Sequence, residues 1–238
     1  MKDLFLHQAL ICCLILGGVC VASDLDPTLV RAVTEKWEET IQAMESRDET
    51  EKHPADAILF IGSSSIRLWE TIDEDMAPYP SIQRGFGGSR FSDVAVYAER
   101  LIQPHSYRAL VLFVGNDVSG KETDATPDQV AGWFQRVVAV SRAHNSEAPV
   151  FCIGVTPTMS RWKAWPRIQE MNAALQAACA ADASLHFIPT ASAYLNANGE
   201  PRPELFREDQ LHLTTLGYQI WAAIIKSHLD GVLGGASN

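Results

Sequence analysis

Three consecutive serines, Ser63 to Ser65, stand where an apolar run gives way to a helix-like pattern. The run from Ile58 to Ile61 ends at Gly62 and is typical of a buried strand in a parallel sheet. The first amide N–H groups of a helix have no partner within it and attract negative charge. A serine at such a corner could be a nucleophile whose own amide holds the oxyanion that it creates, or it could simply cap the helix.

Asp209 and His212 could supply the base that such a nucleophile needs. They are three residues apart, so their side chains can fall on one face of a single turn. The carboxylate can then accept from one imidazole nitrogen and fix the tautomer, which leaves the other nitrogen as a base. The same pattern is also common at the start of a helix, so the pair alone does not decide between catalysis and capping.

The elements that must position these residues alternate along the chain. Strand-like runs lie near residues 58–61, 82–85, 109–114, 149–155 and 185–188. Amphipathic helix-like segments lie near residues 27–44, 91–101, 127–143 and 166–181 and within 209–227. This alternation predicts one α/β domain with three layers, α/β/α: a flavodoxin-like, doubly wound sheet of about five parallel strands.

Polar or glycine-rich clusters follow the first three strands: the serines, then Gly87-Gly88, then Gly115 to Asp117. Ligands of doubly wound sheets bind beyond the carboxyl ends of the strands, so we expect these clusters to meet at one mouth. The loop of residues 156–165 follows the fourth strand and carries Arg161 and Trp162 as candidate substrate-binding residues. The arginine could bind a carboxylate or a glycan hydroxyl. The tryptophan could stack on a sugar ring, or it could pack the loop onto the domain.

Taken together, these segments resemble the SGNH/GDSL hydrolases. That family carries a Gly-Asp-Ser block, a glycine, an asparagine and a D-x-x-H in this order, and the resemblance covers residues 57–229. It implies that Ser64 is the nucleophile, that His212 is the base and that Asp209 orients the imidazole. It also implies a Ser-His-Asp mechanism of ester hydrolysis that needs no metal or organic cofactor.

The resemblance also implies an oxyanion hole. The Gly85 to Ser89 segment looks like the second block of the family and gives Gly88 as a donor. Asn116, in a Gly-Asn-Asp sequence, looks like the side-chain donor of the third block, and the amide of Ser64 would complete the set. Ser63 departs from the pattern, because the family has an aspartate at this position.

These features favour a secreted serine esterase that hydrolyses acetyl or other short-chain acyl esters, with a carbohydrate ester as one candidate substrate. A lysophospholipase-type lipid esterase is an alternative. So is a non-catalytic module that binds glycans or lipids on the same scaffold, for which the Ser63 departure is the only support. No spacing of cysteines and histidines resembles a metal site.

The charge and the N-terminus place further limits on function. The net charge of -10, without a basic cluster, argues against nucleic acid and anionic membrane surfaces as partners. Residues 9–21 are apolar but too short to span a bilayer comfortably, and small residues precede Ser23. We therefore expect residues 1–22 to be a signal peptide and residues 23–238 to form the mature domain, secreted or periplasmic. An uncleaved anchor and a lipid on Cys20 are the alternatives.

Two cysteines, Cys152 and Cys179, remain in the predicted mature chain. Both lie in apolar patterns, one strand-like and one helical. Two cysteines do not make a disulfide framework, so buried free thiols are expected, although an exported protein could pair them.

Overall fold

The computed structural model describes residues 25–234, so the predicted signal peptide lies outside the described residues. The strands are β1 (Ile58–Gly62), β2 (Ser81–Gly85), β3 (Ala109–Phe113), β4 (Val150–Ile153) and β5 (Leu185–Ile188). The α-helices are α1 (Pro27–Asp48), α2 (Ser64–Arg67), α3 (Ile72–Met76), α4 (Phe91–Ile102), α5 (Pro127–His144), α6 (Trp165–Ala180) and α7 (Thr215–Leu233). Three 3-10 helices join them: η1 (Met159–Ala164), η2 (Ala191–Tyr194) and η3 (Pro203–Leu205).

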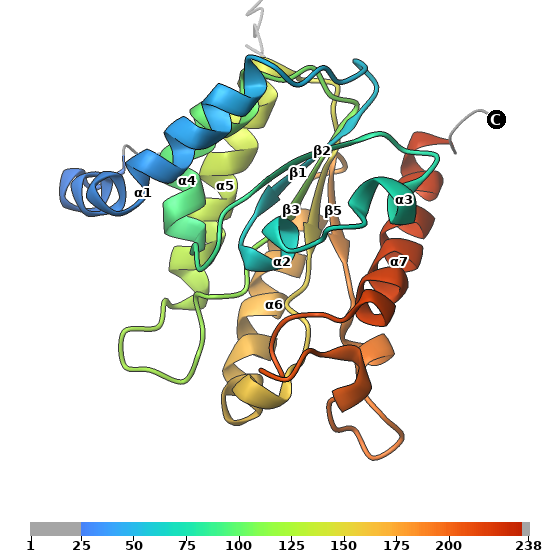
Figure 1. The fold of residues 1–238 in the computed structure, drawn as a ribbon. Helices are drawn as coiled ribbons and strands as arrows, with labels where there is room; N and C mark the ends of the chain where they lie inside the picture. The colour runs from blue at the N-terminus through green and yellow to red at the C-terminus, as the bar shows by residue number, and fades with distance from the viewer. Residues whose placement is uncertain (1–24, 235–238) are drawn as a thin grey trace, which may run out of the picture.

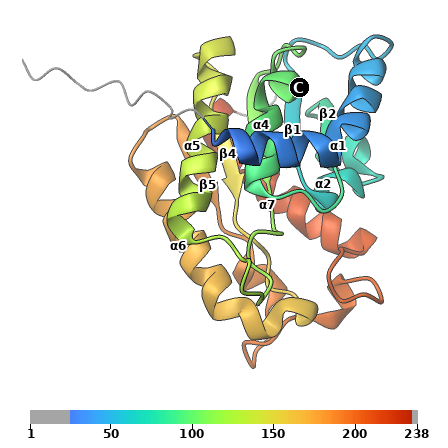
Figure 2. The same cartoon turned by 90° about the vertical axis from the view of Figure 1, so that its left-hand side faces the viewer.

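The five strands form one sheet in the order β2-β1-β3-β4-β5, and every neighbouring pair is parallel. Helices α1, α4, α5 and α6 cover one face, and α3 and α7 cover the other, as Figures 1 and 2 show from two sides. This is the three-layer, doubly wound arrangement that the alternation of segments predicts. All carboxyl ends of the strands meet at one edge, and the site is built there.

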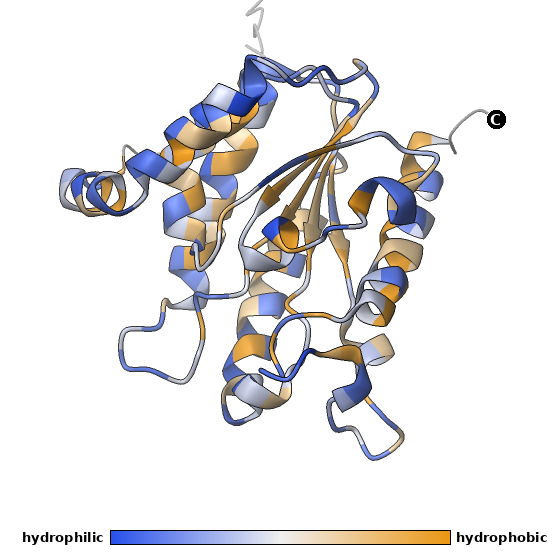
Figure 3. Cartoon of the chain, in the orientation of Figure 1, coloured by the Kyte–Doolittle hydropathy of each residue, from blue (hydrophilic) through white to orange (hydrophobic). Residues whose placement is uncertain are grey.

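The core explains why the strands read as continuous apolar runs. Every residue of β1, β3 and β4 is buried, and the strands lie as apolar segments between the helical layers in Figure 3. On the α7 face, Trp221 packs edge-on against Phe113, and Trp69 stacks on Tyr218. Full burial of an aromatic side chain of this size stabilises a fold by roughly 2–3 kcal/mol, so this cluster holds α7 against the strand ends.

Two helix boundaries differ from the sequence expectation. Helix α1 runs to Asp48, about one turn beyond the expected end, because the buried guanidinium of Arg84 donates to the Asp48 carboxylate at 2.7 Å. Helix α7 begins at Thr215, inside the expected segment, where the Thr214 side chain caps it by accepting from the Gly217 N–H at 3.2 Å, and it runs to Leu233, beyond the expected end. The D-x-x-H sequence therefore lies in a loop before the helix.

Within residues 25–234, no helix combines the length and the apolar character that crossing a membrane requires.

Candidate active site

The serine corner depends on a close approach of β1 and β3. Gly62 has φ +142°, and a Cβ atom at this position would lie 1.9 Å from the Phe113 carbonyl oxygen, so only glycine fits. Directly after it, the Ser63 N–H donates to the same carbonyl at 2.9 Å. Helix α2 then starts at Ser64. The Tyr218 hydroxyl donates to the Ser65 carbonyl at 2.9 Å and anchors this short helix to α7.

His212 lies within hydrogen-bond distance of the serine. Its Nε2 is 2.9 Å from the Ser64 Oγ, although the two residues are 148 positions apart in the sequence. Its Nδ1 is 2.6 Å from Asp209 Oδ2. The carboxylate can only accept, so Nδ1 carries the proton and the unprotonated Nε2 accepts from the Ser64 hydroxyl. The three side chains form an unbroken hydrogen-bond chain.

The loop that holds Asp209 and His212 is a tight turn and not a helical one. Asp209 Oδ1 accepts from the amides of Leu211 and His212, each at 2.9 Å, and Gln210 has φ +54°. Burial alone would raise the pKa of Asp209, but the hydrogen bonds from the His212 ring and from these two amides lower it to about 2. The carboxylate is therefore ionised at neutral pH, as its role beside an imidazole requires.

Of the two further residues predicted for the oxyanion hole, Asn116 lines the pocket beside Ser64, whereas Gly88 is not among its lining residues. Gly88 is exposed with φ +80°, in the loop between β2 and α4. Asn116 follows β3, and its Nδ2 donates to the Ser89 carbonyl at 3.0 Å, which ties the two loops together. Ser89 itself is buried, and its hydroxyl donates to the Gly62 carbonyl at 3.3 Å. The Ser89 carbonyl takes one Nδ2 hydrogen of Asn116, whose side chain lines the pocket.

The buried Asp117 side chain also joins the loop after β3 to the start of α4. Its two carboxylate oxygens accept from the Phe91 N–H at 3.1 Å, where α4 begins. The side chain is fully buried, and burial raises the pKa of Asp117 to about 7 against the opposing effect of the Phe91 N–H. The two carboxyl groups nearest the site are thus opposite in character: Asp209 is ionised and half-exposed, and Asp117 is buried and partly protonated at neutral pH.

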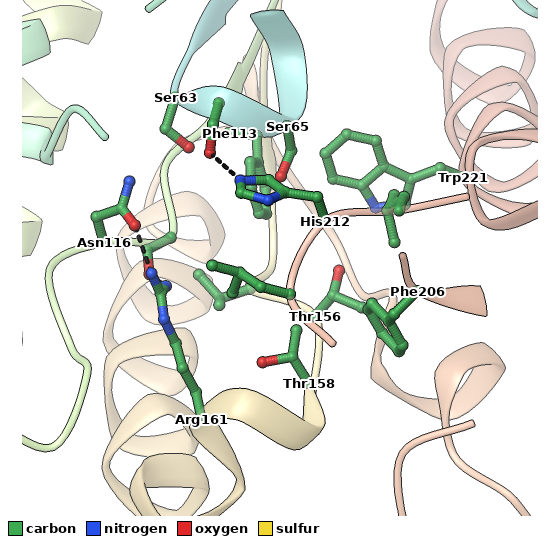
Figure 4. Close-up of a pocket in the computed structure, with 15 residues that line it drawn as sticks. Ser63, Ser65, Phe113, Asn116, Thr156, Thr158, Arg161, Phe206, His212 and Trp221 are labelled. Carbon is green, nitrogen blue, oxygen red and sulfur yellow. Dashed lines mark hydrogen bonds between the residues drawn. The ribbon is translucent and has the colours of Figure 1, made fainter. Parts of the chain in front are cut away.

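A small pocket opens beside Ser64 and His212. Its cavity volume is about 30 Å³, which is room for only one or two water molecules. Apolar side chains from several elements form much of its wall: Phe113, Val155, Phe206, Leu211, Leu213 and Trp221. In Figure 4, Asn116 and Arg161 lie on one side of this pocket and Phe206 and Trp221 on the other, with the His212 ring between them.

The two candidate substrate-binding residues have different positions. Arg161 lines the pocket, but its guanidinium is engaged with the protein: Nη1 donates to the Gly115 carbonyl, and Nη2 donates to Asn116 Oδ1 at 2.5 Å. Trp162 is not among the residues that line the pocket, and its ring stacks on Trp165 at a centroid distance of 6.1 Å. Contact of Trp162 with a substrate stays a prediction.

Sequence reasoning missed several residues that line the pocket. Thr156 and Thr158 belong to the loop of residues 156–165, which the strand-end argument placed at the mouth without singling them out. Phe206 and Trp221 carried no such signal, because they reach the pocket from η3 and α7 through long-range packing. The link between the Ser160 N–H and the Gln210 carbonyl, 3.2 Å, also has no sequence signature.

Neither a metal cluster nor a disulfide is found in the part of the chain that the structure describes. No group of three or more His, Cys, Asp or Glu side chains among residues 25–234 is arranged to hold a metal ion. Cys152 and Cys179 are both free and buried. Burial raises the pKa of both thiols, that of Cys179 to about 12, so neither is a reactive thiolate at neutral pH.

A model of the GDSL-like lipase/acylhydrolase family matches residues 64–220. No match is found among curated proteins.

Solved structures share the fold. One is described as a proposed platelet activating factor from Streptococcus pneumonia, with a TM-score of 0.72 and 18% identity, covering 85% of this chain and 97% of that one. A GDSL-like lipase from Bacteroides thetaiotaomicron has a TM-score of 0.67 and 19% identity, covering 80% and 97%. A carbohydrate esterase family 3 protein from Talaromyces cellulolyticus has a TM-score of 0.58 and 18% identity, covering 76% and 100%.

Proposed function

The chain belongs to the GDSL-like lipase/acylhydrolase family and is a serine hydrolase of ester bonds, and from that premise we propose that it removes acetyl or similarly short acyl groups by a Ser-His-Asp mechanism. The observation that carries this proposal is the hydrogen-bond chain from Asp209 through His212 to Ser64, which ends at the pocket. The only support for the non-catalytic alternative was the serine at position 63, and this serine does not interrupt the hydrogen bonds that join Asp209, His212 and Ser64.

In the proposed mechanism, Ser64 Oγ attacks the ester carbonyl carbon while His212 Nε2 takes the hydroxyl proton. The carbonyl π electrons move to oxygen, and the Ser64 and Gly88 amides with Asn116 Nδ2 hold the resulting oxyanion. Collapse of the tetrahedral intermediate breaks the bond to the alcohol, which leaves with the proton from His212. A water molecule then attacks the acyl-enzyme, again with His212 as base, and releases the acid and free Ser64.

The size of the pocket supports a short acyl group. The buried side chains of Phe113, Val155 and Leu213 wall a cavity of about 30 Å³ beside Ser64, which favours a small acyl group over a long chain. We therefore place acetyl esters ahead of the lipid esters of a lysophospholipase. A carbohydrate is the proposed alcohol part, since one protein that shares the fold is a carbohydrate esterase.

A panel of esters tests this proposal. Acetate, butyrate and octanoate esters of 4-nitrophenol are compared with acetylated xylan and a lysophospholipid. We expect kcat/KM to fall by roughly tenfold or more from acetate to butyrate, because each added methylene must fit a filled pocket. The Ser64→Ala variant should lose the activity, and Ser65→Ala is the matched control. Faster hydrolysis of the octanoate or the lysophospholipid would overturn the short-chain proposal.

We also propose export, with cleavage of residues 1–22. The support is the sequence of the leader alone, whose residues lie outside the described part of the chain. The intact mass of protein recovered from outside the cytoplasm should lack the leader. Retention of Met1, or a lipid on Cys20, would contradict cleavage at this position.

A further inference from the structure

The 3-10 helix η1 contacts both sides of the site through two consecutive residues. The Ser160 N–H donates to the carbonyl of Gln210, which lies between Asp209 and His212. The next residue, Arg161, donates to the Gly115 carbonyl and to Asn116 Oδ1. The same short segment therefore ties the acid–base loop to the loop that carries Asn116.

The hydrogen bonds of the Asn116 amide leave it one orientation. Oδ1 accepts from Arg161, and one Nδ2 hydrogen goes to the Ser89 carbonyl. Turning the amide over would place its NH₂ group against the guanidinium, donor against donor, and its oxygen against the Ser89 carbonyl, acceptor against acceptor. Because the amide is planar, these two partners also fix the direction of the second Nδ2 hydrogen.

The positive charge of the Arg161 guanidinium also makes the Asn116 amide a stronger hydrogen-bond donor. The Arg161 side chain is part-buried and within electrostatic range of Asp117, whose own charge is reduced by burial. A cation hydrogen-bonded to the oxygen of an amide polarises that amide, and its N–H groups become stronger donors in a low-dielectric setting. Asn116 is one of the residues that line the pocket, so its second N–H is the donor that this effect would offer to a bound ester.

We propose that Arg161 is a positioning residue for ester hydrolysis, which holds and polarises the Asn116 amide so that its free N–H points at the developing oxyanion. The proposal rests on the proposed function and adds a residue to it. It differs from the sequence expectation that Arg161 binds a carboxylate or a glycan hydroxyl of the substrate. Two of its five N–H donors already go to protein oxygens, which hold the guanidinium against the Asn116 loop.

The two roles predict different kinetics for Arg161→Met, which keeps apolar bulk but removes the donors and the charge. If Arg161 positions Asn116, kcat for 4-nitrophenyl acetate should fall roughly 10- to 100-fold with KM changed less than about threefold, because a small misplacement of a donor weakens only the transition state. Arg161→Lys keeps the charge and N–H donors but lacks the planar fork that holds both oxygens in a fixed geometry, so it should lose less than Arg161→Met. Arg167→Met is the matched control, since this exposed arginine of α6 contacts Asp124 and lies outside the pocket lining.

A double-mutant cycle identifies the route by which Arg161 acts. In the Asn116→Ala background, adding Arg161→Met should lower kcat by less than about threefold, because the amide through which Arg161 acts is already absent. Thermal unfolding of each variant checks that the protein is folded. The rate of labelling by a fluorophosphonate, whose P–O oxygen occupies the same hole, gives a second readout that needs no turnover and should fall in parallel with kcat.

Three outcomes would overturn the positioning role. The first is a rise in KM at unchanged kcat, confined to an ester that carries a carboxylate such as 4-acetoxybenzoate, which would assign Arg161 to substrate binding. The second is a full, additive loss in the Asn116→Ala background. The third is unchanged kcat and labelling rate in a folded Arg161→Met variant. Failure of the proposed function is distinct, because then the wild type would hydrolyse no ester or Ser64→Ala would keep its activity.

Discussion

Asp209 and His212 lie three residues apart in one loop, whereas the Asn116–Arg161 contact on the other side of the pocket joins residues 45 positions apart. The acid–base loop is also the more exposed side: 48% of the Asp209 side chain and 21% of the His212 side chain are accessible. On the oxyanion side, Ser89 and Asp117 are fully buried. One half of the site is thus a local turn at the surface, and the other half exists only when several loops pack together.

Because of this difference, substitutions on the two sides of the site should affect activity and stability differently. A substitution of His212 in the acid–base loop removes a chemical group with little effect on the core, because the Asp209 side chain and the loop's backbone hydrogen bonds hold the turn. A substitution on the oxyanion side changes both a donor and the packing of the strand ends. Activity and stability should therefore respond separately on the first side and together on the second.

The largest expected effect is that of His212→Ala. The variant lacks the group that takes the Ser64 proton, so kcat should fall by roughly 10⁴-fold or more. The melting temperature should change less than for a core substitution, because the part-buried ring contacts the site loop and is not part of the buried core. Steady-state kinetics with 4-nitrophenyl acetate measures the first effect and calorimetry the second. Substantial activity in the variant would remove His212 from the mechanism.

Asp209→Asn should have a smaller effect than His212→Ala. The amide cannot stabilise an imidazolium, and it can favour the wrong tautomer of His212. Loss of a buried carboxylate from such a triad costs roughly 10⁴-fold, and we expect less here because Asp209 is half-exposed and water can replace part of its effect. If kcat of Asp209→Asn fell as far as that of His212→Ala, the distinction between orienting residue and base would be wrong.

Asn116→Ala tests the oxyanion side. Its N–H interacts more strongly with the oxyanion than with the ground-state carbonyl, so kcat should fall roughly 100- to 1000-fold with little change in KM. The Ser89 carbonyl and the Arg161 guanidinium also lose a partner, so unlike His212→Ala this variant should melt at a lower temperature. Kinetics per folded molecule, with folding checked by circular dichroism, separates the two effects. A kcat within about threefold of wild type would take Asn116 out of the site.

The smallest effect is the pH dependence of stability due to Asp117. In the unfolded chain this carboxyl loses its proton near 3.8, but burial raises its pKa to about 7 in the folded protein. The folded state binds more protons between these values, so this group makes the wild type less stable as pH rises from about 4 to 7, by at most about 4 kcal/mol. Asp117→Asn should lack that slope, while its side-chain oxygen can still accept from Phe91.

Urea denaturation of wild type and Asp117→Asn at several pH values measures this difference. Asp209 gives a contrast of opposite sign: its lowered pKa stabilises the fold above about 4, and that contribution is lost as pH falls toward 2. Identical pH profiles for wild type and Asp117→Asn would contradict the buried, partly protonated state of Asp117.

The two sides also differ in how far the sequence predicts them. The parallel sheet follows from apolar runs and helical spacing, and Asp209 with His212 follows from a short spacing that one turn can close. Even there, the structure has a non-helical turn with a positive φ at Gln210, which the residue types alone did not indicate.

The contacts on the oxyanion side could not be predicted in the same way. Arg161 was expected to face a substrate, because nothing in the sequence pairs it with an asparagine 45 positions away. Trp162 could equally have stacked on a sugar or packed on its own loop, and the apolar character of its ring does not distinguish these roles. Such contacts depend on the three-dimensional arrangement of loops, which a local pattern does not encode.

The central claim is that Ser64, and neither of its neighbours Ser63 and Ser65, is the nucleophile that the Asp209–His212 pair activates. Reaction with a fluorophosphonate followed by peptide mass spectrometry tests it most directly. We expect a single adduct on Ser64, formed rapidly by the wild type and at least about 100-fold more slowly by His212→Ala, which lacks the base. An adduct on Ser63 or Ser65, or an active enzyme that forms none, would contradict the claim.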